Sequence, residues 1–444
     1  MPILTKAPRG TGDVLPGESS KIRFVESTML ETAECFGFKE IRTPGFEHTE
    51  LFNRSVGDTT DIVQKEMYTF NDKGGRSVTL KPEGTAGAVR AFIEHGLFNE
   101  QMPVKLSYVT PAYRYEKPQS GRLREFHQFG VECFGAATPA ADAEVISLGK
   151  QIFDFFGVKD LRLEINSIGC PECRKKYQDA LKSYFSEKED KLCGTCKGRL
   201  NRNPMRILDC KSPICSEIAS HAPVILDYLC DECREHFELV QKYLNAMEIE
   251  FTVNPSIVRG LDYYTRTVFE FVTGSLGAQS AVCAGGRYDG LTEELGGNPT
   301  PACGFALGIE RFMLLLQAEN IELPPENPID LYIASMSPEG NILAAKLASD
   351  IRNEGVTCLF DTVNRSLKAQ MKFAGKTGAL FTVVLGDDEI KAGKAKVKYM
   401  ADGSETEIGL DDFAENFMQI SIGKAVAEFD GGNDFDLSSF LGNM

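Results

Sequence analysis

The alternation of hydrophobic and polar residues predicts a sheet of mainly antiparallel strands, packed with helices, in the first three-quarters of the chain. Apolar residues recur with a helical period over residues 22–34, and residues 38–42 then alternate as a strand that stops at Pro44. Two longer alternating runs, residues 105–116 and 125–134, are joined by a segment with proline and glycine, which is typical of a long hairpin. These two strands are expected to be antiparallel neighbours.

Residues 267–272 and 279–283 form another predicted strand pair, and Gly304–Phe312 opens a helix that continues to Leu316. Antiparallel strands with interspersed helices indicate an α+β fold for this part of the chain.

The pattern changes after a proline-rich segment around residue 325. Predicted strands then alternate with predicted helices in the order strand 329–335, helix 339–353, strand 356–360, helix 366–376, strand 380–385 and a hairpin at 397–400. This order predicts a small α/β domain with a largely parallel core. Residues 426–444 carry acidic residues among glycines, and we expect this tail to be disordered.

Composition excludes several classes of protein. The 444 residues, 42% hydrophobic and 25% charged, are neither disordered nor collagen-like in composition. No apolar run is long enough to span a membrane, and the first ten residues lack the apolar segment of a signal peptide, so we expect a cytoplasmic protein without a membrane partner. Because the net charge is −16, any polyanion must bind at a local basic patch.

Eight of the thirteen cysteines lie between residues 170 and 233. Cys170 and Cys173 form one C-x2-C pair, Cys193 and Cys196 form another, and this spacing predicts a four-thiolate structural zinc site. A second set of four follows along the chain, made of Cys210, Cys215, Cys230 and Cys233. The alternative interpretation is a group of reduced, partly buried thiols that bind no metal.

The same segment is locally basic, because residues 170–211 contain eleven lysines or arginines and six acidic residues. In a chain of negative net charge this contrast favours contact with phosphate groups. A solvated helix face is the alternative explanation.

Candidate chemistry lies on the predicted hairpin. Arg114 and Glu116 share one face of the first strand, and Phe126, Gln128 and Glu132 share one face of the second. These side chains suit a ligand pocket, although an exposed polar sheet face would also carry them. No G-x4-G-K-[ST] loop occurs and no G-x-G-x-x-G follows a predicted strand, so side chains would have to hold the phosphates of any nucleotide.

Three segments resemble, in order, the three signature motifs of class II aminoacyl-tRNA synthetases. They are the strand that ends at Pro44, the hairpin segment Tyr113–Glu132, and Gly304–Phe312. The signature sequences of class I synthetases are absent.

Two further segments, Arg259–Tyr264 and Ala284–Leu291, resemble the signatures of histidyl-tRNA synthetases, and Pro82–Thr85 is similar to the amino-acid loop of that family. The resemblance runs from about Arg9 to Phe417, and the chain is identified from it as a member of this family.

The resemblance implies a set of residues that bind histidine, namely Glu83, Thr85, Gln128, Glu132, Tyr263 and Tyr264. Glu83 and Thr85 would hold the α-amino group and Gln128 would contact the amino acid moiety. Glu132 and Tyr264 would bind the two imidazole nitrogens.

The resemblance also implies a set of residues that bind ATP, namely Arg114, Glu116, Arg122, Phe126 and Arg311. Arg114 would bind the α-phosphate, Glu116 the adenine amino group and Arg122 the outer phosphates, while Phe126 and Arg311 would enclose the adenine ring. Arg259 would approach the α-phosphate from the side opposite Arg114, which makes these two arginines the expected catalytic residues.

The family resemblance further implies an order of domains. Residues 1–168 and 252–325 would form a class II catalytic core, 169–251 a cysteine-rich insertion, and 326–425 an anticodon-binding domain. The expected activity is ligation of histidine to its tRNA, with ATP as substrate, Mg²⁺ as cofactor and a homodimer as the assembly. The cysteine pairs are not general in the family, so the zinc prediction depends on their spacing alone.

Two other functions fit parts of the sequence. A catalytically silent, histidine-sensing regulatory paralogue would share the core, but such proteins lack the C-terminal domain and lose phosphate-binding arginines. A zinc-ribbon RNA-binding protein would account for the cysteines but not for Arg259–Tyr264 or Ala284–Leu291.

Overall fold

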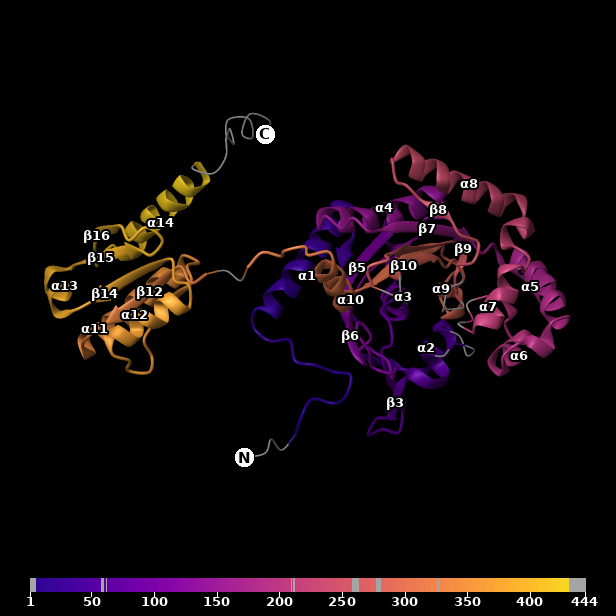
Figure 1. Ribbon diagram of the computed structural model, residues 1–444, viewed down its shortest axis with the longest axis horizontal. Helices are drawn as coiled ribbons and strands as arrows, with labels where there is room; N and C mark the ends of the chain where they lie inside the picture. The colour runs from indigo at the N-terminus through magenta and orange to yellow at the C-terminus, as the bar shows by residue number, and fades with distance from the viewer. Residues whose placement is uncertain are drawn as a thin grey trace. The chain divides into compact units, whose positions relative to one another are not determined.

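The computed structural model describes residues 5–56, 60, 62–208, 210, 212–257, 263–276, 281–325 and 328–430. The chain divides into two compact units, Met1–Pro325 and Glu326–Met444 (Figure 1). The division falls in the proline-rich segment that separates the two sequence patterns.

Within the described residues of the first unit, eight strands form one sheet in the order β1-β5-β6-β11-β10-β9-β7-β8. The pairs at its two ends, β1 with β5 and β7 with β8, are parallel, and the pairs between them are antiparallel. The strands are β1 (Lys39–Glu40), β5 (Val104–Tyr113), β6 (Glu125–Phe134), β7 (Arg162–Ser167), β8 (Thr252–Val253), β9 (Thr265–Val272), β10 (Ala281–Arg287) and β11 (Ala302–Gly308). This mainly antiparallel sheet confirms the α+β prediction.

The predicted long hairpin is confirmed as the antiparallel pair β5 and β6. Because successive side chains of a strand point to opposite faces, the side chains of β6 separate into two sets. Phe129, Val131 and Cys133 enter the main hydrophobic core, whereas Gln128 and Glu132 lie on the opposite face and line cavities. The period of two in the sequence therefore produces one apolar and one functional face.

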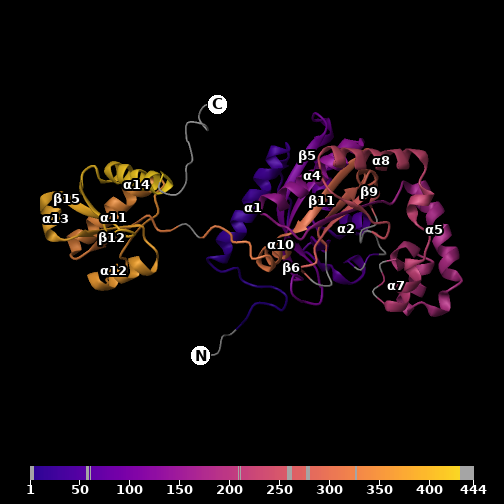
Figure 2. The same ribbon diagram turned by 45° about the horizontal axis from the view of Figure 1, so that its top comes forward.

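Helices cover the apolar face of the sheet, as Figures 1 and 2 show for α1 and α4. Apolar residues of four helices belong to the same core as Phe129, Val131 and Cys133 of β6. These helices are α1 (Glu18–Cys35), α4 (Pro139–Phe155), α8 (Asp231–Ala246) and α10 (Ile309–Ala318).

The opposite face carries the helices α2 (Thr49–Val56), α3 (Thr85–Glu94) and α9 (Leu291–Glu294) and a small sheet of order β2-β4-β3. Its strands are β2 (Phe46–His48), β3 (Tyr68–Asn71) and β4 (Ser77–Leu80). Val89 and Phe92 of α3 pack with Leu106 and Phe134 of the large sheet, so the start of α3 is held close to the polar residues of β6.

Between β7 and β8 the chain leaves the sheet and forms a helical insertion (Figure 1). Its helices are α5 (Pro171–Ser186), α6 (Gly194–Leu200), α7 (Pro213–Ser220) and α8. Buried cysteines and the apolar side chains of α5 form its core together.

In the second unit, described strands form a sheet of order β13-β12-β14-β15-β16. The first three are parallel and the last two add antiparallel strands, which confirms the predicted α/β pattern. The elements are β12 (Leu331–Ser335), α11 (Pro338–Asn353), β13 (Cys358–Phe360), α12 (Leu367–Lys376), β14 (Phe381–Leu385), α13 (Asp387–Ala392), β15 (Lys394–Tyr399), β16 (Glu405–Gly409) and α14 (Phe413–Asp430).

Some boundaries differ from the sequence prediction. The predicted strand 38–42 is reduced to β1, and Gly304–Gly308 belongs to β11 because it pairs with strands on both sides, so that α10 begins only at Ile309. The expected disordered tail begins inside α14, which continues to Asp430, and residues 431–444 lie outside the described residues. In the part of the chain that the structure describes, no helix combines the length and apolar character that membrane crossing requires.

Candidate functional site

A buried cavity of about 170 Å³, here named the carboxylate cavity, lies on the polar face of β6. Carboxylates and phenols are prominent in its lining. The lining residues are Glu83, Thr85, Arg114, Gln128, Glu132, Tyr263, Tyr264, Ala284, Tyr288, Gly304, Phe305 and Ala306.

Glu132 is the central acceptor of the carboxylate cavity and is 1% exposed. Tyr108 donates a hydrogen bond of 2.9 Å to its Oε1, and the hydroxyl of Tyr288 donates to its Oε2. Burial raises the pKa of Glu132 to about 8, although the hydrogen bonds from Tyr288, Thr85 and Tyr108 act in the opposite direction. A carboxyl group with this pKa can carry or release a proton near neutral pH, which suits a ligand ring that has both a protonated and an unprotonated nitrogen.

Glu83 lies at the start of α3, where its two oxygens accept hydrogen bonds of 2.8 Å from the backbone N–H groups of Thr85 and Ala86. Burial raises its pKa. Each carboxylate oxygen has a further lone pair, so Glu83 can still accept a hydrogen bond from a cationic amino group.

Glycines make room for this arrangement. The ring of Tyr108 lies against Gly84 and Gly130, where an added Cβ would approach the ring to 2.2 and 2.4 Å. At Gly304 an added Cβ would lie 2.2 Å from Oε2 of Glu132 and from a backbone oxygen of Val131. A larger residue at these positions would displace Glu132 or the phenol that holds it.

A second cavity of about 330 Å³, here named the arginine cavity, adjoins the first. Its lining residues are Arg114, Glu116, Gly121, Arg122, Leu123, Phe126, Gln128, Ala281, Val282, Cys283, Ala284, Ala306, Gly308, Glu310 and Arg311. Burial and the positive charge of Arg122 lower the pKa of Arg311, and Nη1 of Arg122 lies 3.1 Å from Oε2 of Glu116. The positive charges of Arg122 and Arg311 repel each other, so the cavity favours a polyanion that lies between them.

Arg114 and Gln128 line both cavities and mark their junction. Arg114 is held by a hydrogen bond of 2.8 Å from its Nε to the carbonyl oxygen of Pro82, and its guanidinium lies 5.2 Å from the ring centre of Phe126. Oε1 of Gln128 is buried and has no hydrogen-bond partner among the described residues. A ligand that extends across the junction would supply that partner.

The predicted histidine-binding and ATP-binding residues in the described part of the chain all line one of these two cavities. Arg259 lies outside the described residues, so its predicted role is untested. Sequence reasoning missed Tyr108 and Tyr288, two phenol donors to Glu132. Tyr288 lies inside the segment Ala284–Leu291 that the sequence had already singled out, which is the signal that could have identified it.

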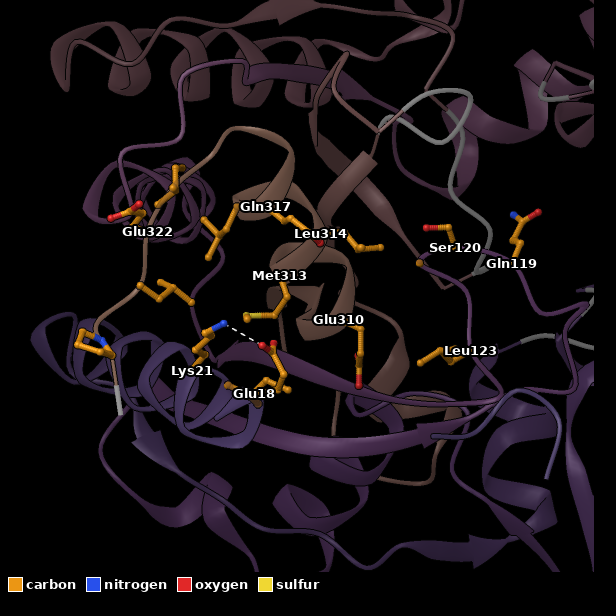
Figure 3. A pocket seen from close by; sticks show the side chains of 16 residues that line it. Glu18, Lys21, Gln119, Ser120, Leu123, Glu310, Met313, Leu314, Gln317 and Glu322 are labelled. Atoms are coloured by element: carbon orange, nitrogen blue, oxygen red, sulfur yellow. Dashed lines mark hydrogen bonds and ion pairs between the residues drawn. The ribbon is translucent and has the colours of Figure 1, made fainter. Parts of the chain in front are cut away.

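A larger cavity of about 960 Å³ shares Gly121, Leu123 and Glu310 with the arginine cavity but differs in chemistry (Figure 3). Its walls come from α1, α10 and residues 119–123 and 321–325, and many of the side chains are apolar. Among the described residues that line it, Lys21 is the one cation, and Lys21 is already paired with Glu18 at 2.8 Å. This cavity is therefore not equipped to bind phosphate.

The predicted cysteine sets are wrong in their pairing. The structure groups Cys170 and Cys173 with Cys230 and Cys233, and it groups the other four cysteines separately, as Cys193, Cys196, Cys210 and Cys215. The reason is α5, whose 16 residues span about 24 Å and carry the chain away from the first C-x2-C pair before the second is reached. The start of α8 then returns to the start of α5.

Comparisons with known proteins agree with this geometry. The chain matches the family model described as histidyl-tRNA synthetase over residues 10–180 and 216–312, and the model described as anticodon binding domain over residues 330–420. It is 57% identical over 411 residues to a histidine–tRNA ligase of Caldanaerobacter subterraneus subsp. tengcongensis, with 92% of this chain and 98% of the relative covered. It is 55% identical over 410 residues to the histidine–tRNA ligase of Clostridium novyi, with 92% and 98% covered.

Among solved structures, the fold is similar to that of an apo histidyl-tRNA synthetase of S. aureus, with a TM-score of 0.81 and 41% sequence identity. That likeness covers 93% of this chain and 100% of the other.

Proposed function

The chain belongs to the histidyl-tRNA synthetase family, and we propose that it activates L-histidine with ATP and transfers the histidine to the 3′ end of its cognate tRNA. The observation that carries this proposal is the pair of adjoining cavities: one presents a buried carboxyl group with two phenol donors, and the other presents guanidinium groups. An amino acid in the first and a nucleotide in the second would meet at Arg114.

Histidine is the amino acid that the carboxylate cavity fits. Glu132 would bind one imidazole nitrogen, and the hydroxyl of Tyr264, with Tyr263 packed beside it at 4.7 Å between ring centres, would bind the other. Glu83 and Thr85 would hold the α-amino group. An amino acid without two ring nitrogens would leave buried polar groups unpaired, and this is the basis of strong selectivity.

ATP fits the arginine cavity. Arg114 would bind the α-phosphate, Arg122 the outer phosphates and Glu116 the adenine amino group, with Phe126 and Arg311 on the two sides of the adenine ring. Mg²⁺ takes oxygen ligands and, when bound to the outer phosphates, would offset part of their negative charge. With Glu116 assigned to the adenine, Glu310 is the remaining carboxylate among the described residues that line this cavity, and its oxygens are of the kind that the ion prefers.

The residues of the junction would act by position and charge. The carboxylate of histidine is ionised at neutral pH and attacks the α-phosphorus without a general base, forming a carboxyl–phosphate bond as the bond to pyrophosphate breaks. Two anions must approach each other, and Arg114 would stabilise the charge that develops on the α-phosphate oxygens. We assign the same role on the opposite side to Arg259.

The remaining parts of the chain are assigned by the same proposal. Residues 1–168 and 252–325 would form the catalytic core, 169–251 an insertion that contacts tRNA through its basic residues, and 326–425 the domain that reads the anticodon. The family match further supports a homodimer and a cytoplasmic location. The insertion is also proposed to contain structural zinc.

The regulatory paralogue is the weaker alternative, because the anticodon-binding model matches residues 330–420 and the cavity retains three arginines. The deciding experiment is ATP–pyrophosphate exchange with each of the twenty amino acids, followed by charging of tRNA. Exchange with histidine alone, and charging of one tRNA, are expected. Histidine binding without exchange would establish the regulatory function instead.

A further inference from the structure

Eight cysteines of the insertion gather into two groups of four among the described residues. Within each group the sulfur atoms all lie within 4.8 Å of one another. The first group, here named the proximal cluster, is Cys170, Cys173, Cys230 and Cys233, and the second, named the distal cluster, is Cys193, Cys196, Cys210 and Cys215.

The C-x2-C pairs share one local geometry. Cys170, Cys193 and Cys230 are the N-cap residues of α5, α6 and α8, and in each case the second cysteine of the pair is the third residue of the helix. A helix N-terminus presents backbone N–H groups and positive partial charge, which stabilise a thiolate. The same geometry in three cysteine pairs favours a metal-binding role over unrelated buried thiols.

The distances between sulfurs match four ligands around one ion. Tetrahedral coordination with zinc–sulfur bonds of about 2.3 Å places the sulfurs about 3.8 Å apart. The sulfurs of Cys170 and Cys173 are 3.5 Å apart, and those of Cys193 and Cys210 are 3.9 Å apart, far longer than a disulfide bond of about 2.05 Å. A four-thiolate tetrahedral set of this size is typical of a single zinc ion.

Backbone groups complete both clusters. The N–H of Cys230 donates to the sulfur of Cys173 at 3.1 Å, and the N–H of Cys193 donates to the sulfur of Cys215 at 3.3 Å. Such bonds orient metal ligands and offset the negative charge of a thiolate. In each cluster the bond links the two cysteine pairs that come from different parts of the chain.

We propose that the insertion binds two zinc ions with crossed connectivity, one in the proximal cluster and one in the distal cluster. The first and last cysteine pairs hold one ion and the four cysteines between them hold the other. The distal cluster lies wholly within residues 181–215, which the family model does not match, so its ligands fall outside the family match.

The proximal ion would also position a wall of the carboxylate cavity. Arg174, the residue after Cys173, donates a hydrogen bond of 2.9 Å from Nη1 to the carbonyl oxygen of Tyr264. The residue before the cluster contacts the same segment, because the backbone N–H of Arg266 donates a hydrogen bond of 2.9 Å to the carbonyl oxygen of Gly169. The proximal cluster therefore connects the base of the insertion directly to the segment that carries Tyr264.

The distal ion would have a different role. Its ligands fix α6 and α7, and α6 carries Lys197 and Arg199 of the basic segment. Loss of this ion should therefore disturb tRNA contact and spare histidine activation. These two functional consequences depend on the proposed synthetase activity, whereas metal binding itself does not.

The test begins with metal analysis of the purified full-length protein, where two zinc ions per chain are expected. The connectivity is tested with three double variants that are challenged with a chelator. Cys173→Ala/Cys233→Ala and Cys196→Ala/Cys215→Ala should each retain one chelator-resistant ion, and Cys173→Ala/Cys196→Ala should retain none, because it weakens both clusters. Replacement of exposed Cys35 by serine is the control and should retain both ions.

Other outcomes would overturn the proposal. One resistant ion in Cys173→Ala/Cys196→Ala would show that the cysteine pairs combine in sequence order. Native protein that contains disulfide bonds at these cysteines, or no metal, would exclude zinc. Wild-type protein loaded with Co²⁺ gives a readout that needs no variant, since two tetrahedral thiolate sites should take up two ions with thiolate charge-transfer absorption. Uptake of one Co²⁺ ion would exclude one of the two sites, and uptake of none would exclude both.

Kinetics separate the two roles. Arg174→Ala should raise KM for histidine roughly tenfold with kcat nearly unchanged, as expected from loss of a hydrogen bond to a charged donor. Cys196→Ala/Cys215→Ala should leave histidine-dependent exchange normal and raise KM for tRNA. If wild-type protein binds zinc with the expected connectivity but shows no ATP–pyrophosphate exchange, only the synthetase proposal is refuted. If native protein contains no zinc but shows normal exchange, only the zinc proposal is refuted.

Discussion

Tyr108 on β5 donates a hydrogen bond of 2.9 Å to Oε1 of Glu132 on the neighbouring strand β6. Tyr288 donates to the other oxygen of the same carboxyl group. Two phenol donors leave Glu132 fixed in orientation while burial raises its pKa to about 8. The cavity thus contains a carboxyl group that is costly to ionise in the free protein and that is positioned to form a hydrogen bond with a ligand.

Glu132→Gln should stabilise the ligand-free protein at alkaline pH while abolishing histidine-dependent exchange. The pKa of Glu132 rises from 4.5 in the unfolded chain to about 8 in the folded protein, so the folded state binds more protons and loses stability as pH rises through this window. The full difference corresponds to about 5 kcal/mol of unfolding free energy.

The measurement is the thermal midpoint of wild type and variant between pH 5 and pH 9. The gap between the two proteins should widen in favour of the glutamine variant as pH rises. Glu34→Gln on the exposed surface of α1 is the control and should follow wild type. Curves that stay parallel would show that Glu132 titrates normally.

Tyr108→Phe should lower kcat/KM for histidine by roughly tenfold or more, because it leaves a buried carboxyl oxygen without its phenol donor. Phenylalanine keeps the ring that packs on Gly84 and Gly130, so the fold should survive. Tyr113→Phe is a matched control, because Tyr113 also donates to a glutamate of the same hairpin, Glu125, at 3.3 Å but lines neither cavity. Equal loss in both variants would mean that the effect comes from the hairpin and not from Glu132.

The face of the hairpin that carries the site could be predicted from sequence, because the period of a strand places Gln128 and Glu132 on one side whatever the rest of the fold does. The donors to Glu132 could not be predicted in this way. Tyr108 and Tyr288 are 24 and 156 residues away along the chain, and only the register of the sheet brings them to one carboxyl group. The local sequence pattern predicts the face of the strand on which a side chain lies, whereas its hydrogen-bond partners depend on the tertiary structure.

The cysteines illustrate the same limit. Pairing C-x2-C motifs in sequence order assumes that the chain between them closes a loop, but residues 174–186 belong to α5 and extend as a rigid helix. Recognising the helical period of α5 in advance would have argued against the predicted combination of Cys173 with Cys196. The sequence predicted the ligand type and number, and the helix decided which ligands meet.

Arg311→Ala should raise KM for ATP roughly tenfold and leave KM for histidine almost unchanged, since a guanidinium stacked on a ring contributes about 1 to 2 kcal/mol. Arg311→Lys should recover only part of the loss, because an ammonium group keeps the charge but cannot stack as a plane. Exchange kinetics with each substrate varied in turn provide the measurement. Arg76→Ala, at an exposed turn, is the control. Equal increases in KM for ATP and for histidine would mean that Arg311 supports the fold and does not contact the nucleotide.

Removing exposed positive charge from the insertion should weaken tRNA binding and flatten its dependence on salt, because fewer counterions are released from the RNA. The variant replaces Lys175, Lys176, Lys197 and Arg202 by alanine. Arg199 is left in place because its Nη1 donates to the carbonyl oxygen of Arg206 at 3.0 Å, so its loss would disturb the insertion itself.

The control variant removes an equal number of exposed cations elsewhere in the first unit, at Lys6, Lys73, Lys159 and Arg162. KM for tRNA measured at several salt concentrations should rise only in the first variant, with pyrophosphate exchange normal in both. A salt dependence identical to wild type would show that this basic face is solvated and makes no contact with RNA.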